Sequence, residues 1–336
     1  MRRKTLLLAG LVATLLAALG LWRLADHDLA HWRSQTFDIQ GPGPRISGTI
    51  WLPDGPAVAV LAVVHGDGPQ DRTSGGGYAA MFNVLLERRI ALAAWDKPGV
   101  GASQGNWLDQ SMADRTRETR DVLRHLRRRF QGTPVGALGF SQAGWVLPAL
   151  TRADADFLVL VGPAVSWQDQ GDYYTGVRLR RDGLSEPEIQ ARLAEEARED
   201  DRMFGPDATA ADAPEGLPPD RWRFIRTNRD ADARADLATL DLPLLAIWGQ
   251  DDLNVDAARN AAIYRESLAS RAAPTKIMIW PDATHGLLKS PAYNWQLTED
   301  WSTFARLRYL VEGRHAFAPG VLGAIAAWIS EVGTRP

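Results

Sequence analysis

Hydrophobic and polar positions divide the chain into short apolar runs and longer amphipathic stretches. From about residue 37, short apolar or β-branched runs alternate with longer helical patterns. The expected strands are Ile46–Trp51, Val58–Val64, Ile90–Trp95, Val135–Gly139, Phe157–Val161, Leu244–Trp248 and Lys276–Trp280. Helical patterns cover Tyr78–Arg88 and Met112–Phe130. Because nearly all-apolar runs suit parallel strands that are buried on both faces, the pattern predicts an α/β fold with a mostly parallel sheet and helices on both faces.

The stretch from residue 165 to 240 departs from this alternation. It contains no convincing strand, and its composition is polar and charged. Ser185-Glu186-Pro187-Glu188 forms a capping box with proline in the first turn, which predicts a helix that ends near Asp201. Residues 207–220 are rich in Ala, Pro and Asp and favour a loop. We therefore expect a helical insertion, residues 165–240, in a core formed by residues 37–164 and 241–336.

The N-terminus has a different pattern. Arg2, Arg3 and Lys4 precede an apolar run from Leu6 to Leu21, so residues 1–25 are typical of a secretory signal peptide or a signal anchor. The run is intermediate in length between a signal core and a membrane span, which leaves cleavage and anchoring open. In both cases we expect an extracytoplasmic body, periplasmic or secreted, with membrane contact if the segment is retained. The alternative is a buried N-terminal helix.

Composition and charge narrow the partners and the chemistry. The formal net charge of −3 gives no reason to expect nucleic acid as a partner. The chain has no cysteine, which excludes disulfides, thiolate zinc sites and a cysteine nucleophile. No pattern in the sequence indicates an oligomeric state.

A candidate nucleophile follows the expected strand Val135–Gly139. The segment Gly139-Phe140-Ser141-Gln142-Ala143-Gly144 begins at the end of that strand and opens a helical segment. A strand-to-helix turn sharp enough to expose a serine hydroxyl needs small neighbours, usually in the pattern Gly-x-Ser-x-Gly. Ala143 replaces the second glycine but is nearly as small. The pattern alone is common by chance, and its place at a strand end favours Ser141 as a nucleophile.

A nucleophilic serine needs a base and a carboxylate that orients the base. His285 follows the expected strand Lys276–Trp280 through a short loop, at the sheet edge where catalytic groups gather. His65 also follows a strand, but it comes too early for the chain order Ser, Asp, His. The acid should follow the strand Leu244–Trp248, where residue type alone does not separate the candidates. These candidates are Asp251, Asp252 and Asp256.

The transition state of acyl transfer also needs donors for its oxyanion. One expected donor is the backbone N–H of Gln142, directly after the serine. The other should come from the loop His65-Gly66-Asp67-Gly68-Pro69 after the strand Val58–Val64. We expect the N–H of Asp67 in this role, with that of Gly66 in reserve. The alternative for this loop is a tight turn without a catalytic role.

Taken together, these motifs resemble the α/β-hydrolase superfamily, and within it the bacterial esterase and dienelactone-hydrolase-related group. The resemblance covers the chain from about residue 45 to the end, apart from the insertion. It rests on the segments His65-Gly-Asp-Gly-Pro-Gln-Asp-Arg72, Trp95-Asp-Lys-Pro-Gly-Val-Gly-Ala-Ser103, the turn at Ser141, Gly249-Gln-Asp-Asp252 and Thr284-His-Gly286. It implies that Asp252 is the acid, that the insertion is a lid, and that residues 96–103 are scaffold. That last segment departs from the family pattern, since Pro98 stands where an arginine is usual.

The resemblance and the motifs predict a serine hydrolase, a carboxylesterase that cleaves a small-molecule ester through an acyl-enzyme. Ser141, His285 and Asp252 are the expected catalytic residues, and neither a metal nor a cofactor is expected. A peptidase or amidase of the same fold is one alternative, and a catalytically silent binding protein is another. Trp145, Trp167 and Trp280 lie close to the motifs and would suit either a pocket wall or the core.

Overall fold

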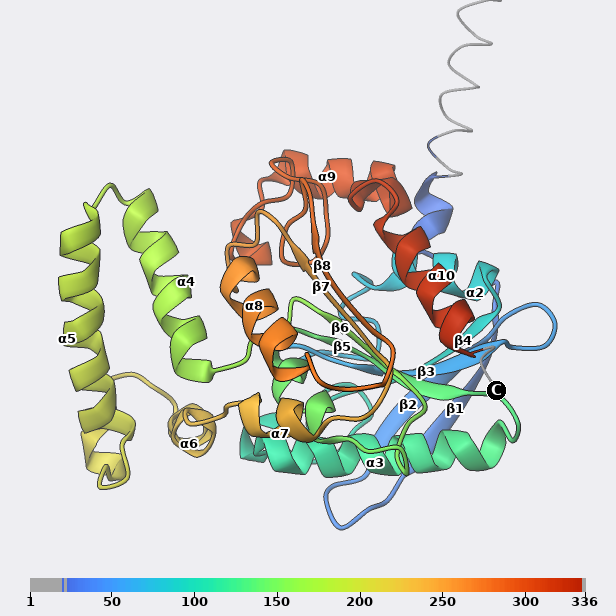
Figure 1. Cartoon of the computed structure of the whole chain (residues 1–336), viewed down its shortest axis with the longest axis horizontal. Helices are drawn as coiled ribbons and strands as arrows, with labels where there is room; N and C mark the ends of the chain where they lie inside the picture. Colours follow the sequence, from blue (N-terminus) through green and yellow to red (C-terminus); the bar gives the residue numbers. More distant parts are fainter. Residues whose placement is uncertain (1–19, 21–22, 334–336) are drawn as a thin grey trace, which may run out of the picture.

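A twisted sheet of eight strands forms the centre of the molecule (Figure 1). The computed structural model describes residue 20 and residues 23–333. In space the strand order is β1-β2-β4-β3-β5-β6-β7-β8; β2 is antiparallel to both its neighbours, and all other pairs are parallel. The strands are β1 (Arg33–Ile39), β2 (Ile46–Leu52), β3 (Ala59–Val64), β4 (Ile90–Trp95), β5 (Val135–Phe140), β6 (Leu158–Val161), β7 (Leu244–Gly249) and β8 (Thr275–Trp280). The predicted fold class is confirmed.

Helices cover both faces of this sheet. On one face lie α2 (Ala79–Glu87) and α10 (Val321–Gly333), and on the other lie α3 (Met112–Arg129), α7 (Arg234–Thr239) and α8 (Ala257–Ser267) (Figure 1). Strand β3 shows why its sequence is apolar throughout. Val60 and Ala62 belong to the core beneath α3, whereas Leu61 and Val63 belong to the core beneath α2 and α10. A central parallel strand thus buries both of its faces.

Strand β1 was not predicted. It begins at Arg33, before the expected start of the core at residue 37, and pairs with β2 through its whole length. Only Phe37 on this edge strand is buried, so its sequence carries neither an apolar run nor a clear alternation. A strand held mainly by backbone pairing leaves little hydrophobic signal in the sequence.

The segment 165–240 is mainly helical in the structure. It contains α4 (Trp167–Arg181), α5 (Glu186–Phe204), α6 (Pro219–Asn228) and α7, and the pair α4 and α5 projects away from the sheet (Figure 1). The predicted capping box is present, because the side chain of Glu188 accepts from the Ser185 N–H at 2.8 Å. The helix it opens continues three residues beyond the expected end at Asp201. Within the expected loop, residues 210–212 form a short 3-10 turn.

The remaining elements lie around the ends of the strands. Helix α9 (Thr303–Glu312) follows the long loop after β8. The short 3-10 turns are η1 (Ala25–His27), η2 (Trp107–Asp109), η3 (Ser141–Trp145), η4 (Leu147–Ala149), η5 (Ala210–Asp212), η6 (Thr298–Asp300) and η7 (Gly313–Ala316). Within residues 20 and 23–333, no helix is both long and apolar enough to cross a membrane. The predicted signal peptide or anchor falls almost entirely outside the described residues.

Candidate active site

The turn at the end of β5 has the geometry that its small residues predict. Ser141 follows the strand directly and has φ of 48°, a left-handed conformation that is rare and strained for a residue with a side chain. Such strain is expected where a strand must turn sharply to expose a serine. A Cβ on Gly139 would lie 2.6 Å from the Cβ of Ala143. The methyl group of Ala143 therefore fits here only because residue 139 has no side chain.

The segment after Ser141 differs from the expected helix. It forms the 3-10 turns η3 and η4, with Pro148 in the second. Proline has no N–H to donate and its ring clashes with an α-helical turn, so a regular α-helix does not run through this segment. Gly144 keeps this segment tight against the end of β6, since a Cβ there would lie 2.7 Å from the carbonyl oxygen of Ala164.

His285 and Asp252 meet across the ends of β7 and β8. The Nδ1 of His285 lies 2.7 Å from Oδ2 of Asp252, and Asp252 is only 3% exposed. Burial alone would lower the pKa of His285, but the charge of Asp252 and its hydrogen bond raise that pKa above its ordinary value. Gly249 permits the two loops to approach, because a Cβ there would lie 2.2 Å from the carbonyl oxygen of Thr284.

The three candidate aspartates have different local roles. Oδ1 of Asp252 accepts the N–H groups of Asn254 at 2.7 Å and Val255 at 2.9 Å, which fixes the carboxylate so that Oδ2 faces the imidazole. Asp256 caps helix α8 by accepting from the N–H of Arg259. Asp251 uses its backbone, whose N–H donates to Ala283 and whose carbonyl accepts from Asn294. Of the three, Asp252 is the one whose carboxylate contacts His285.

Gly162 brings His285 to the nucleophile, and sequence reasoning missed it. Phe140 pairs with Val161 across β5 and β6, so Ser141 and Gly162 leave the sheet side by side, about 4.8 Å apart as neighbouring strands are. A Cβ on Gly162 would lie 2.8 Å from Cε1 of His285. The imidazole thus lies against Gly162, next to Ser141. Its Nδ1 is occupied by Asp252, and within the described residues Nε2 has no hydrogen-bond partner.

We expect Gly162→Ala to lower kcat by about 100-fold, because the new methyl group must push the imidazole away and a displacement of about 1 Å has an effect of this size. Gly162 also has φ of 57°, which adds strain to any side chain there. Gly171 in α4 offers the matched control, since a Cβ there meets nothing within 4 Å. Steady-state kinetics of both variants test this. Equal activity in the two would contradict the position assigned to His285.

The loop after β3 lies beside Ser141. A Cβ on Gly66 would lie 3.4 Å from the Cβ of Ser141. The carbonyl oxygen of Gly66 accepts from Nζ of Lys97 at 2.6 Å, and that of His65 accepts from Nη2 of Arg115 at 2.6 Å. In a trans peptide the N–H points opposite to the carbonyl, so the N–H of Asp67 points away from Lys97. Two buried basic side chains thus orient the peptides that carry the expected oxyanion donors.

Arg115 joins the two sides of this expected oxyanion site. Besides His65, its guanidinium donates to the side chain of Gln142, the residue directly after Ser141. The other end of the Gln142 side chain donates to Oδ1 of Asp67 at 2.9 Å. Burial, together with the nearby Arg115, lowers the pKa of Lys97 well below its ordinary value. No motif indicated Arg115, which lies in α3 among several other arginines.

Without the Arg115 side chain, the backbone N–H groups of Gln142 and Asp67, the two expected oxyanion donors, should be held less firmly in position. We expect Arg115→Met to lower kcat by about 10- to 100-fold and to change KM less. This loss of kcat is smaller than the roughly 100- to 1,000-fold loss that follows removal of an oxyanion donor itself. Arg117→Met is the control on the same helix, because the Arg117 side chain is 59% exposed and forms an ion pair with the neighbouring Asp114. Kinetics with a thermal melt separate this effect from unfolding. A changed KM with unchanged kcat would refute the positioning role of Arg115.

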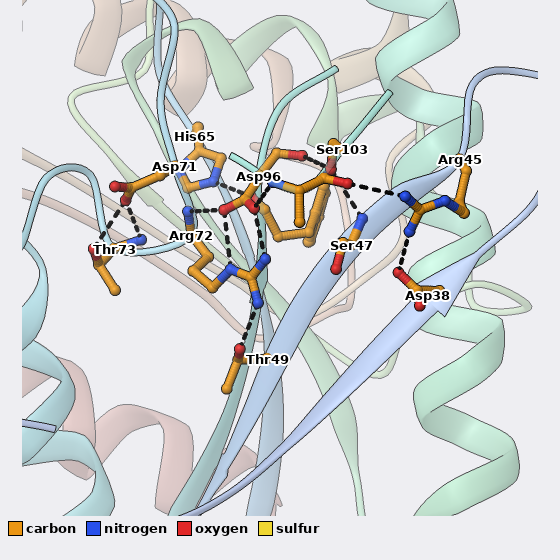
Figure 2. A network of polar contacts seen from close by, with 12 residues as sticks. Asp38, Arg45, Ser47, Thr49, His65, Asp71, Arg72, Thr73, Asp96 and Ser103 are labelled. Carbon is orange, nitrogen blue, oxygen red and sulfur yellow. Dashed lines mark hydrogen bonds and ion pairs between the residues drawn. The ribbon is translucent and has the colours of Figure 1, made fainter. Parts of the chain in front are cut away.

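A second network holds the loop that continues beyond Asp67, and Figure 2 shows it. The buried carboxylate of Asp96, at the end of β4, accepts the backbone N–H of Arg72 at 2.8 Å and its guanidinium at 2.6 Å. Burial would raise the pKa of Asp96, but its bonds to Arg72 and to the N–H of Ala102 lower it. The hydroxyl of Ser103 donates to the Asp96 carbonyl at 2.7 Å. Residues 96–103 thus brace the loop, as the resemblance implied.

His65 is structural rather than a second base. Its Nε2 lies 2.6 Å from the carbonyl oxygen of Trp95, and its ring stacks on Tyr78. Burial, the largest influence, lowers the pKa of His65 to about 3. A buried, neutral imidazole that bonds to the backbone agrees with the exclusion of His65 from chain order alone.

A cavity of about 890 Å³ opens above Ser141 and Gln142. Its walls include the loop after β3, the helical segment 165–240 and the loop after β8. Those of its lining residues that belong to the helical segment are Trp167, Gln170, Tyr174 and Arg221. Trp145 also lines it, whereas Trp280 is not among its lining residues. The helical segment is hydrogen-bonded to the loop that carries Asp252, because the hydroxyl of Tyr173 donates to the carbonyl of Asp252 at 2.7 Å.

Comparison with known proteins supplies the family. The model of the family described as serine aminopeptidase S33 matches residues 55–292. Sequences of curated proteins give no match to the chain.

Among solved structures, a thermostable carboxyl esterase from Bacillus coagulans has a TM-score of 0.55 and 15% identity, with 88% of this chain and 99% of that one covered. The Pyrococcus furiosus esterase PF2001 has a TM-score of 0.53 and 15% identity, with 77% of this chain and 84% of that one covered. At these identities the similarity establishes the fold. The family match extends over more than half of the sequence, and the chain therefore belongs to the serine aminopeptidase S33 family of α/β-hydrolases.

Proposed function

We propose that the protein is a serine hydrolase that cleaves carboxylic esters through an acyl-enzyme. The observation that carries this proposal is the 2.7 Å hydrogen bond between His285 and the buried Asp252, with the imidazole against Gly162, which leaves the sheet beside the strained Ser141. A carboxylate that holds an imidazole beside a serine is the arrangement that activates a hydroxyl as a nucleophile. Ser141 is the proposed nucleophile.

The proposed reaction has two halves. Nε2 of His285 takes the proton of Ser141 as the hydroxyl oxygen attacks the ester carbonyl, and Asp252 stabilises the imidazolium. The negative charge on the carbonyl oxygen is met by the N–H groups of Gln142 and Asp67. The same imidazole then protonates the leaving alcohol. In the second half a water molecule attacks the acyl-serine with His285 as base, and the acid product leaves.

Segment 165–240 is proposed to be a lid over the substrate cavity. Its side chains line the cavity above Ser141, which supports this role. Arg221 of α6 lies 3.6 Å from the carboxylate of Asp67, on the proposed oxyanion loop. The helices of the lid thus touch both the loop that would bind the oxyanion and the loop that carries Asp252. Substrate size and shape would then depend on this segment.

An amidase or peptidase is the second candidate. The family is described as a serine aminopeptidase, and the proposed catalytic residues do not distinguish an amide from an ester. The two named structural neighbours are described as esterases, and for this reason we favour esters. The test is a hydrolysis screen that covers p-nitrophenyl esters of increasing chain length, lactones, and amino-acid anilides. Anilide hydrolysis with no ester turnover would replace the esterase proposal with a peptidase.

We also propose that the body of the protein lies outside the cytoplasmic membrane. The support is the sequence of residues 1–25, with its basic start and apolar run. A fusion of residues 1–36 to alkaline phosphatase should be active, because that reporter matures only after export. An inactive phosphatase fusion together with a fluorescent cytoplasmic reporter would instead indicate a cytosolic enzyme.

A further inference from the structure

Helix α9 exposes its apolar side to solvent. Phe304, Leu307 and Val311 are 74%, 57% and 55% exposed, whereas Ala305 on the opposite side is buried. A surface helix of a soluble protein normally has the reverse arrangement, with its apolar stripe against the core. We call Phe304, Leu307, Leu310 and Val311 the α9 face.

Exposed large apolar side chains are confined to one region of the described chain. Six such residues occur in residues 20 and 23–333, namely Leu24, Leu297, Phe304, Leu307, Leu310 and Val311. Four belong to α9, Leu297 comes directly before the turn η6 that precedes α9, and Leu24 comes directly before η1. Scattered single apolar residues need no explanation, but a contiguous group of this kind marks an interaction surface.

The start of the described chain is fastened to the same region. Asp26 forms an ion pair with Arg314 at 2.6 Å, directly after α9. The ring of His27 packs on Tyr309, and its Nε2 lies 3.2 Å from the carbonyl oxygen of Leu310. These contacts tie residues 26 and 27 to α9 and to the turn that follows it. Figure 1 shows the chain entering the molecule beside this helix.

The length of the connection limits how far the α9 face can lie from the apolar N-terminal segment. That segment ends at Leu21, and Asp26 is already fixed to the body. Five residues span at most about 18 Å even when fully extended. If the apolar segment enters a bilayer, the end of α9 that contacts Asp26 and His27 therefore lies within about 18 Å of the surface of that bilayer.

We propose that the α9 face docks on a lipid bilayer. An amphipathic helix that lies in the membrane interface buries its apolar side among the acyl chains, and binding strength grows with the apolar area buried. The occupant is thus the lipid surface itself, next to the point where the N-terminal segment would meet it.

An apolar cavity of about 640 Å³ lies beneath the same helix. Tyr309 and Leu310 of α9 form one side of it, and Phe140 and Gly286, the neighbours of Ser141 and His285, form another. Leu310 belongs to both the exposed face and the cavity wall. This role rests on the proposed esterase function: the cavity would bind the acyl chain of an ester dissolved in the membrane.

The docking is tested with the full-length protein in vesicles of phosphatidylcholine with a minor share of phosphatidylglycerol. The chain has no cysteine, so Phe304→Cys and Leu307→Cys each give one site for an environment-sensitive fluorophore. Arg128→Cys, exposed on α3 across the sheet, is the control. We expect labels at 304 and 307 to shift to the blue and to be quenched by brominated acyl chains, and the label at 128 to do neither.

Labels at 304 and 307 that respond like the control would overturn the proposal. A blue shift without quenching by the brominated lipid would overturn it as well, since the face would then be covered by a second copy or by the chain itself. These labels report docking without any turnover, so the result stands even if no ester is hydrolysed. With an ester substrate, Phe304→Asp with Leu307→Asp should slow hydrolysis of a vesicle-embedded long-chain ester by about tenfold and leave a soluble ester unaffected.

Discussion

Ser141→Ala should reduce kcat for an activated ester by about 10⁶-fold, the effect typical of removing the nucleophile from such a site. The alanine has no oxygen to attack the carbonyl, and the residual rate comes from the oxyanion donors and substrate binding alone. Folding should be intact, because Ser141 is partly exposed and its hydroxyl has no hydrogen-bond partner among the described residues. Initial rates with p-nitrophenyl acetate and a thermal melt measure the two effects.

The control for this variant is Ser111→Ala. Ser111 caps helix α3, where its side chain accepts the N–H of Asp114, so its loss should lower stability by about 1 kcal/mol without a loss of activity. The two serines therefore separate catalysis from folding. Activity of Ser141→Ala within tenfold of the unaltered protein would remove Ser141 from the mechanism.

Asp252→Asn should lower kcat by about 10⁴-fold, and Asp251→Asn should have little effect. An amide at position 252 favours the wrong tautomer of His285 and does not stabilise the imidazolium. The carboxylate hydrogen-bonded to the imidazole is that of Asp252, at 2.7 Å. Kinetics of the two single variants compare neighbouring residues of the same type. A larger loss of kcat in Asp251→Asn than in Asp252→Asn would identify Asp251 as the catalytic acid instead.

The same pair predicts a shift in pH dependence. Catalysis needs neutral His285, and Asp252 raises the pKa of this imidazole, so activity should fall as the pH drops through a value above the ordinary 6.5. In Asp252→Asn the charge that favours the protonated form is gone, so the pKa of His285 falls. The acid limb of kcat/KM should move to lower pH even though the rate is smaller. An unchanged acid limb would mean that another group controls it.

The sequence predicted the parts of this molecule that are set by local pattern. The apolar strands were found because central parallel strands bury both faces, and the turn at Ser141 because its geometry requires small residues. The choice between Asp251 and Asp252 could not be made from residue type, because both follow the same strand. It depends on the turn in which Asn254 and Val255 bind one carboxylate oxygen and leave the other for His285.

Other features depend on contacts between distant segments. Arg115 is one arginine among several in α3, and only the packing of that helix brings it to both His65 and Gln142. Gly162 is one glycine among 30; the pairing of β5 with β6 places it beside Ser141, and its contact with His285 forms only when the loop after β8 packs against it. That α9 turns its apolar side outward could not be predicted either, since a periodic pattern does not tell which side of a helix faces the core.

The most direct test of the central claim is the site at which a fluorophosphonate reacts. Such a probe bonds covalently to a serine that an adjacent base activates, so it reports the nucleophile without knowledge of the substrate. Intact-mass analysis and peptide mapping should find one adduct per chain, on Ser141, and none in the Ser141→Ala variant. An adduct on another residue, or no adduct in a folded protein, would contradict the assignment of Ser141, His285 and Asp252 as the catalytic residues.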